Sequence, residues 1–178
     1  MTAPIFREIL EQNPNLEIVM VSRGFFKDVF EGVPRLTFKG VNVEEYKGYF
    51  GLTKLAKELE AEFKPNYIAD LHQVIRSKIL NFYFKRKGYS VFNLDKGKEE
   101  KKELTDVNNI DKKQLKLTTE RYADVFRKMG FSIELSHQLR PISEVKEGVG
   151  FAPFAQHEGK IMPEDKAFEL ASLIAKTK

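Results

Sequence analysis

The apolar and polar residues alternate along the chain between a helical and an extended pattern. Leu52, Leu55, Leu59 and Phe63 recur at helical spacing, whereas residues 16–22 form a short, mostly apolar run typical of a buried strand. This pattern predicts strands over 16–22, 35–41, 66–71, 89–95 and 148–155. It predicts helices over 24–33, 49–63, 74–88, 118–130 and 163–176, and one more that opens with Pro4 in its first turn.

Strands that alternate with helices of this length favour βαβ units, so the expected fold class is α/β with a mainly parallel sheet. Residues 96–116 carry many charges and few apolar positions, which predicts a loop or an exposed short helix. Residues 131–147 look irregular and contain Pro141, and they are the best candidate for a domain boundary. An open α/β sheet binds ligands outside the carboxyl ends of its strands, so the loops after the strands are where a site is expected.

The composition suits a globular protein of about one domain. The chain has 178 residues, of which 42% are hydrophobic, and its 15 Phe residues are enough for a substantial core. No stretch approaches the roughly 18 continuous apolar residues of a membrane span, and the N-terminus lacks the pattern of a signal peptide. Cysteine is absent, which excludes disulfides, thiolate metal sites and a cysteine nucleophile and fits a reducing compartment. We therefore expect a cytoplasmic protein.

Positive charge is concentrated in one part of the chain. The net charge is only +4, but residues 76–102 hold nine Lys and Arg residues against three acidic ones. The segment fits two interpretations equally well: a solvated basic helix face, or a surface for an anionic ligand.

The loop after the strand at 66–71 carries the first candidate site residues. Asp70 and His72 lie at the exit of the strand, and Arg76, Ser77 and Lys78 occupy the first turns of the next helix. Free N–H groups and the helix dipole attract anions at such a helix start. The plainer alternative makes Asp70 a helix cap and His72 an ordinary loop histidine.

Two further strand-end loops carry lysines. Lys96, Lys98 and Lys102 follow the strand at 89–95, where mobile ammonium groups would suit a phosphate-bearing partner, although a solubilising loop explains them almost as well. After the strand expected at 148–155, Gly159 would let the backbone approach a ligand, and Lys160 lies just before Pro163 and an acidic first helical turn.

Several other site classes find no support. The three histidines, His72, His137 and His157, form no recognisable metal motif, and neither G-x-S-x-G nor G-x-G-x-x-G occurs. The residues around Lys160 are not a P-loop, because the Ser or Thr after the lysine and the upstream glycine spacing are missing. Aromatic residues do not interleave with the basic ones as a single-strand nucleic-acid platform requires, so nucleic acid is not an expected partner.

Five segments in order resemble one known family. They are TAPIFREI (2–9), ADLHQVIRSKIL (69–80), DKGKEEKKELT (95–105), TTERYADVFRKMGF (118–131) and GFAPFAQHEGKIMP (150–163). Together they resemble glycosyltransferase family 9, the ADP-heptose:lipopolysaccharide heptosyltransferases, in the form found in Bacteroidetes-type bacteria. No single segment is decisive, but five in this order cover nearly the whole chain.

The resemblance implies a GT-B architecture, in which two Rossmann-like domains face each other across a cleft. Residues 1–140 would be the acceptor-side domain without its first strand, and residues 141–178 the start of a truncated donor-binding domain. Thr2-Ala3-Pro4 matches the family's Thr-x-Pro, but the preceding strand and the Gly-Asp loop with the proposed catalytic base have no counterpart, so no catalytic residue is assigned. The expectation is a transferase fragment that is inactive by itself, with an unpaired strand edge that makes it either marginally stable or prone to associate with another chain, including a second copy of itself.

The family's functional positions map onto residues already singled out. Lys160 matches the lysine that contacts the donor diphosphate, and Gln156 lies where relatives often have a hydroxyl residue, with Gly159 beside them. The remaining matches line the acceptor side: Asp70, His72, Arg76, Ser77, Lys78, Lys96, Lys98 and Lys102. An Arg-Tyr pair at Arg121 and Tyr122 would be structural or would line the cleft.

The implied reaction is the transfer of heptose, or a similar sugar, from a nucleotide-sugar such as ADP-heptose to an anionic lipopolysaccharide-core acceptor. A carboxylate would remove the proton of the acceptor hydroxyl, and Lys160 with helix N–H groups would stabilise the leaving diphosphate. No cofactor and no metal are implied, and the glycolipid acceptor implies a peripheral contact with the inner membrane. The alternative is a non-catalytic α/β module whose basic loops bind a phosphorylated ligand or RNA.

Overall fold

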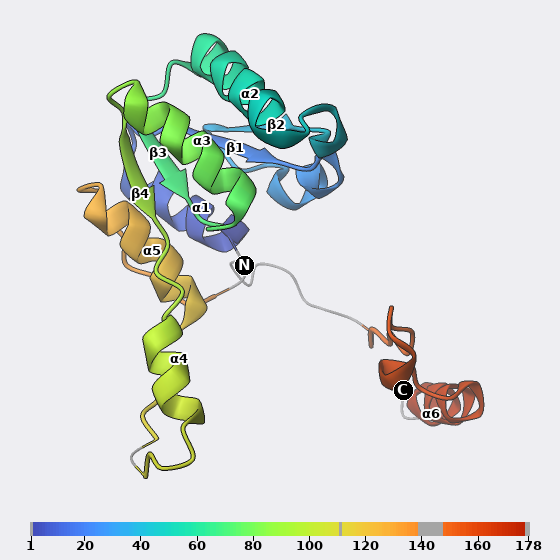
Figure 1. Ribbon diagram of the computed structural model, residues 1–178. Helices are drawn as coiled ribbons and strands as arrows, with labels where there is room; N and C mark the ends of the chain where they lie inside the picture. The colour runs from blue at the N-terminus through green and yellow to red at the C-terminus, as the bar shows by residue number, and fades with distance from the viewer. Residues whose placement is uncertain (1, 111, 139–147, 177–178) are drawn as a thin grey trace. The chain divides into compact units, whose positions relative to one another are not determined.

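The computed structural model describes residues 2–110, 112–138 and 148–176. It is a mixed α/β structure, as the alternating pattern predicts (Figure 1). The chain divides into two compact units, 1–140 and 141–178, of which the first holds every strand described. The α-helices and strands of the first unit are α1 (Thr2–Gln12), β1 (Ile18–Ser22), β2 (Leu36–Gly40), α2 (Gly48–Phe63), β3 (Tyr67–Asp70), α3 (Ile75–Arg86), β4 (Ser90–Asn93), α4 (Lys98–Thr105) and α5 (Thr118–Lys128).

The four strands form two separate parallel pairs. β1 pairs with β2 from Ile18 opposite Leu36 to Ser22 opposite Gly40, and β3 pairs with β4 from Tyr67 opposite Ser90 to Asp70 opposite Asn93. Each is a two-stranded sheet, and within the described residues no strand joins them. Both pairs are parallel because each connection is a crossover that returns the chain to the same end: η1, a 3-10 helix over Gly24–Phe30, joins β1 to β2, and α3 joins β3 to β4.

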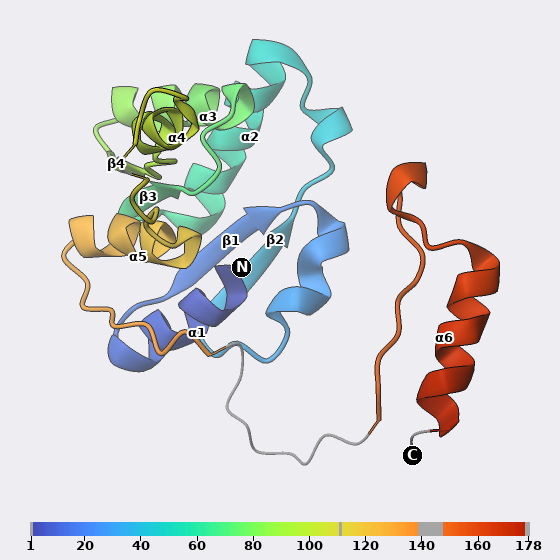
Figure 2. The same cartoon turned by 90° about the horizontal axis from the view of Figure 1, so that it is seen from below.

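Two apolar clusters cover opposite faces of the strands. The α1 cluster joins α1, η1 and α5 and packs against Ile18 and Met20 of β1. Its centre is Phe6, whose ring lies 5.8 Å from that of Phe30 and 6.0 Å from that of Phe126. The α2–α3 cluster holds α2 and α3 against the other face, through Ile68 of β3 among others. Figure 2 shows α2 and α3 on the side of the strands away from α1.

The end of α1 is fixed by side chains from distant segments. Arg35, in the left-handed region with φ 56°, donates hydrogen bonds to the carbonyls of Asn13, Pro14 and Leu16 and to that of Leu10. A cation at a helix C-terminus satisfies carbonyls that have no partner inside the helix.

The segment after α5 runs along α1 and is tied to it by side-chain bonds. Gln12 exchanges two hydrogen bonds with the backbone of Glu134, both 2.8 Å long. Glu8 accepts from the backbone N–H and the hydroxyl of Ser136, again at 2.8 Å. These bonds explain how residues 131–138 are held without helix or strand, as the missing periodicity predicts, while the rest of the irregular stretch lies outside the described residues.

The predicted strand at 148–155 is wrong. Residues 148–155 adopt neither helix nor strand, and residues 158–160 form a short 3-10 turn before α6 (Glu164–Lys176). An extended apolar run becomes a strand only when another strand pairs with it, and the described part of the second unit contains none. The helix predicted at 163–176 is correct to within one residue, and Pro163 accepts the N–H of Ala167 in its first turn.

The α1 cluster makes a prediction about stability. Replacing Phe6 with Ala should lower the free energy of unfolding by about 3–5 kcal/mol, because a fully buried aromatic side chain leaves a cavity among α1, η1 and α5. Replacing the exposed Phe25 with Ala is the matched control and should change it by less than about 0.5 kcal/mol. Urea unfolding followed by circular dichroism measures the free energy of unfolding of both variants. Equal losses for Phe6→Ala and Phe25→Ala would contradict the central place of Phe6 in the α1 cluster.

Candidate functional site

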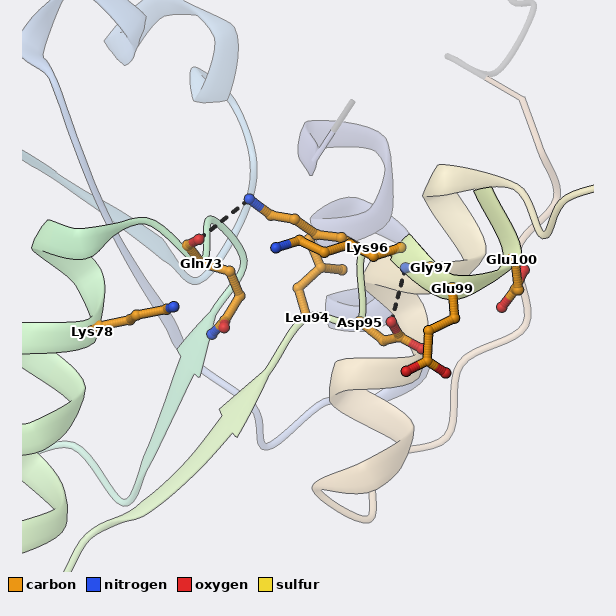
Figure 3. A pocket seen from close by; sticks show the side chains of 9 residues that line it. Gln73, Lys78, Leu94, Asp95, Lys96, Gly97, Glu99 and Glu100 are labelled. Carbon is orange, nitrogen blue, oxygen red and sulfur yellow. Dashed lines mark hydrogen bonds between the residues drawn. The ribbon is translucent and has the colours of Figure 1, made fainter. Parts of the chain in front are cut away.

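One concave site lies at the carboxyl ends of β3 and β4. It encloses about 370 Å³ and contains polar and charged side chains from the loop after β3, the start of α3 and the β4–α4 loop. Its lining residues are Gln73, Lys78, Leu94, Asp95, Lys96, Gly97, Lys98, Glu99 and Glu100 (Figure 3). The site therefore lies where two strand ends meet, which is the position expected for ligands in a parallel sheet.

The loop after β3 is organised by a buried carboxylate rather than by a ligand. Asp70 is 5% exposed, and its side chain accepts four hydrogen bonds. One oxygen accepts from the backbone N–H groups of His72 and Gln73 at 2.9 and 2.8 Å. The other accepts from the side-chain amides of Gln73 and Asn81 at 2.9 and 2.7 Å. Asp70 thus positions Gln73 at the site, and it does not line the site itself.

The protonation of Asp70 is set by two opposing effects. Burial raises the pKa of Asp70, whereas the backbone N–H groups of Gln73 and His72 and the amide of Asn81 stabilise the carboxylate. The hydrogen bonds prevail, and the pKa of Asp70 lies below its usual value. The loop is therefore held by a charged group throughout the neutral range.

The start of α3 is capped by its own residues. The hydroxyl of Ser77 accepts the N–H of Val74 and donates to the Val74 carbonyl, both at 3.0 Å. Ser77 therefore caps the start of α3. Of Arg76, Ser77 and Lys78, only Lys78 lines the site. Arg76 and His72 are exposed and lie outside that lining.

The β4–α4 loop supplies the other two lysines. Lys96 donates to the carbonyl of Gln73 at 3.3 Å, which joins the two strand-end loops. Gly97 has φ 59°, and its N–H donates to the Asp95 carboxylate at 2.8 Å. Lys96 and Lys98 lie on either side of this glycine in the sequence, and both line the site. Lys102, about one helical turn after Lys98 on α4, does not.

Arg121 on α5 balances the acidic residues of the site. Its side chain is 6% exposed and donates to Glu100 at 2.5 Å, with Asp95 at 3.8 Å. A Cβ atom added to Gly97 would lie 2.4 Å from the Arg121 guanidinium carbon and would force that side chain to shift, and the φ of 59° also favours glycine. Arg121 is therefore structural: it holds the β4–α4 loop to α5. The resemblance singled out the Arg-Tyr pair, but nothing in the residue pattern indicated this ion pair.

The lining holds three lysines and three carboxylates, and the neighbouring Arg121 adds one further positive charge. Two of the three carboxylates contact Arg121, while no ion pair is found for Lys78, Lys96 or Lys98 within the described residues. Three ammonium groups from three positions can bind one phosphate or carboxylate. No cluster of His, Asp and Glu suitable for a metal ion occurs in the part of the chain that the structure describes.

The other candidate residues lie elsewhere. Lys160 and Gly159 belong to the 3-10 turn of the second unit, with Gln156 just before it, and all three are exposed. The Lys160 N–H donates to the His157 carbonyl at 2.9 Å. In the first unit, a second concavity of about 510 Å³ lies at the carboxyl ends of β1 and β2, bordered by Arg23 and Asn42 among others.

The Asp70 network makes a prediction about pH. Replacing Asp70 with Asn should cost about 1–3 kcal/mol of stability at pH 7, because an amide N–H₂ would face the donors of Gln73 or Asn81. Because the pKa of Asp70 is lowered on folding, its contribution is present above the unfolded value of about 3.9 and is lost as pH falls through the folded pKa.

Urea unfolding of both proteins between pH 7 and pH 2 should therefore show a stability difference that shrinks below about pH 4. Asp106→Asn is the matched control, since Asp106 is exposed and its carboxylate accepts the N–H of Asn108. A difference between native protein and Asp70→Asn that stays constant with pH would contradict the network.

The Arg121 ion pairs make a separate prediction. Arg121→Met should lower the free energy of unfolding by about 1–2 kcal/mol, because it removes the ion pairs with Asp95 and Glu100. The loss stays in this range because the exposed ends of both carboxylates regain water. Lys101→Met, an exposed change on α4, should have almost no effect. Thermal unfolding compares the two, and unchanged stability of Arg121→Met would show that the ion pairs do not hold the loop.

Comparison with known proteins adds no relative. No protein-family model, no curated protein and no solved structure matches the chain. Within the described residues, no helix combines the length and apolar character needed to cross a lipid bilayer.

Proposed function

We propose that the first unit binds an anionic sugar acceptor at the carboxyl ends of β3 and β4, as the acceptor-side half of a sugar transferase. The observation that carries the proposal is the convergence of Lys78, Lys96 and Lys98 on one concave site, with Arg121 compensating its carboxylates. A parallel α/β unit with its site at the strand ends is also what a Rossmann-like domain of a GT-B enzyme would present.

The chemistry of such an acceptor suits these residues. Lipopolysaccharide-core sugars carry carboxylates and phosphates, and mobile lysine ammonium groups bind both without demanding one geometry. The openness of the lining to solvent suits an oligosaccharide, whose other hydroxyls Gln73 and Glu99 can bind. The acceptor hydroxyl would attack the anomeric carbon of the donor sugar as the nucleoside diphosphate leaves.

In that transferase, the second unit would begin the donor side. Lys160 would place its ammonium group beside the diphosphate, as its match to the family implies, and Gln156 and Gly159 would border the same phosphate. The support for this assignment is the family resemblance together with the exposure of all three residues.

A second candidate is a non-catalytic module that binds a phosphorylated ligand or RNA. The same three lysines favour it, because they attract any phosphate. The two candidates differ in what the site discriminates: a sugar acceptor requires binding that depends on the glycan, whereas RNA binding depends mainly on phosphate charge and salt.

The test is binding of a phosphorylated lipopolysaccharide-core oligosaccharide, measured by calorimetry against its dephosphorylated form. The double variant Lys96→Ala, Lys98→Ala should weaken binding about tenfold, because each screened ion contact contributes about 0.5–1 kcal/mol. Lys57→Ala, an exposed lysine of α2 outside the site, is the matched control.

The outcomes separate the candidates. Tighter binding of the phosphorylated oligosaccharide than of a single-stranded RNA at 150 mM salt, an approximate physiological value, supports the acceptor site. Binding of RNA that falls steeply with salt, with no affinity for the oligosaccharide, favours the second candidate. Equal affinity of the double variant and the native chain would overturn both.

A further inference from the structure

We propose that Gln73 determines the ligand specificity of the concave site at the ends of β3 and β4. Its side-chain carbonyl accepts a hydrogen bond from a hydroxyl of the bound anion. The site then selects a phosphate carried by a hydroxylated carbon chain, as in a phosphorylated sugar or polyol, over a phosphate of the same charge without hydroxyls. The inference rests on the proposed function in one respect, namely that Lys78, Lys96 and Lys98 bind an anion.

The strand register brings together the two oxygen atoms that organise Gln73. Asp70 and Asn93 end β3 and β4 and lie opposite each other, so their side chains point to the same face. The Asn81 amide, from α3, donates to Asp70 Oδ2 at 2.7 Å and to Asn93 Oδ1 at 3.1 Å. The Gln73 amide donates to the same two oxygens at 2.9 and 2.7 Å. Each oxygen therefore accepts from both amide nitrogens.

The charge of Asp70 determines which way each amide points. A carboxylate can accept hydrogen bonds but cannot donate them, so Gln73 and Asn81 must each turn their nitrogen toward it. These two nitrogens in turn require an oxygen from Asn93, which fixes the third amide. Burial opposes ionisation, but the hydrogen bonds hold the pKa of Asp70 below its usual value, so the orientation persists at neutral pH.

This network leaves Gln73 with one group to offer a ligand. Both N–H groups of its amide have acceptors, so the remaining group is the carbonyl oxygen Oε1. Within the described residues, no hydrogen bond to this oxygen is found, and no buried side-chain nitrogen or oxygen lacks a partner. Gln73 is half-buried and lines the site, so Oε1 is open to the solvent of the site.

The position of this acceptor is fixed from the backbone as well. Gln73 has φ 52°, in the left-handed region that residues other than glycine seldom adopt. Its N–H donates to Asp70 at 2.8 Å, and its carbonyl accepts from Lys96 at 3.3 Å. A side chain held at both ends loses little conformational freedom when a ligand binds. Glu99, also in the lining, is exposed and negatively charged, so it would lose more freedom and would repel an anion.

The chemistry of Oε1 defines the ligand class. In Figure 3, Lys78 extends toward the amide end of Gln73, and both residues line the site. A ligand whose phosphate contacts Lys78 therefore presents the adjoining part of its chain to the Gln73 oxygen. A hydroxyl there can donate to Oε1, whereas a methyl or methylene group would displace water from the oxygen without replacing its hydrogen bond.

The experiment compares two phosphates of equal charge, glycerol phosphate and propyl phosphate, of which the second lacks both hydroxyls. NMR titration of the full chain at neutral pH measures the two dissociation constants. The native chain should bind glycerol phosphate about three- to tenfold more tightly, which is the range of one neutral hydrogen bond.

The variant Gln73→Met keeps the length of the side chain and removes the carbonyl oxygen. It should bind both phosphates equally, with the affinity for propyl phosphate unchanged, because the lysines remain. Glu99→Gln is the matched control in the same lining and should keep the preference for glycerol phosphate. A purely structural role of Gln73 would instead weaken both ligands by the same factor and leave their ratio unchanged.

Two results would overturn the proposal: equal affinity of the native chain for the two phosphates, which is measured without any variant, or a preference that persists in Gln73→Met. Absence of binding by either phosphate would also overturn it.

The double variant Lys96→Ala, Lys98→Ala separates this inference from the proposed function. It should weaken both phosphates by the same factor and keep their ratio. Equal native affinities that fall in the lysine variant would leave the anion site standing without a role for Gln73. A preference that is lost in Gln73→Met but does not respond to the lysine variant would support Gln73 and contradict the lysine site.

Discussion

The need of every strand for backbone partners governs the first unit. Four parallel strands offer eight edges, and the two pairs use four of them. Within the described residues, no strand pairs with the remaining edges of β1 and β3. The helices cover both faces of the strands, α1 with α5 on one face and α2 with α3 on the other. The helix layers therefore hold the two pairs in the same unit without a continuous sheet between them.

This arrangement also explains where the candidate site lies. The β3–β4 pair is complete in itself, and its carboxyl ends bring the loop after β3 against the β4–α4 loop. The buried carboxylate of Asp70 organises the first loop, and the buried guanidinium of Arg121 organises the second. Neither group lines the site as a ligand contact, yet each determines where a lining residue lies. Lys78 and Lys98 are exposed and Lys96 is half-buried, and within the described residues none of the three forms an ion pair, so they are available to an anion.

The two units differ in how much apolar surface each buries with its own residues. The first buries two apolar clusters, ties residues 131–138 to α1, and caps the end of that helix with Arg35. In the second, one buried residue of α6, Ala167, is found among the described positions, and Phe168 and Leu173 stay exposed. A helix with one buried side chain gains little from packing, so the apolar face of α6 is not explained by the second unit alone.

The amino-acid pattern determined the elements whose periodicity is local. The leucine repeat of α2, the apolar runs of β1 and β3 and the charged stretch around α4 were predictable, because side-chain spacing and turn residues act over a few positions. The lysines of the strand-end loops can also be read from the chain, and the structure brings Lys78, Lys96 and Lys98 to one concave surface. The division of the strands into two pairs, the loss of a strand at 148–155, and the burial of Asp70 and Arg121 were decided only by tertiary structure. Hydrogen-bond partners and burial depend on residues far apart in sequence, such as Arg121 and Glu100, and no local pattern records which of them meet.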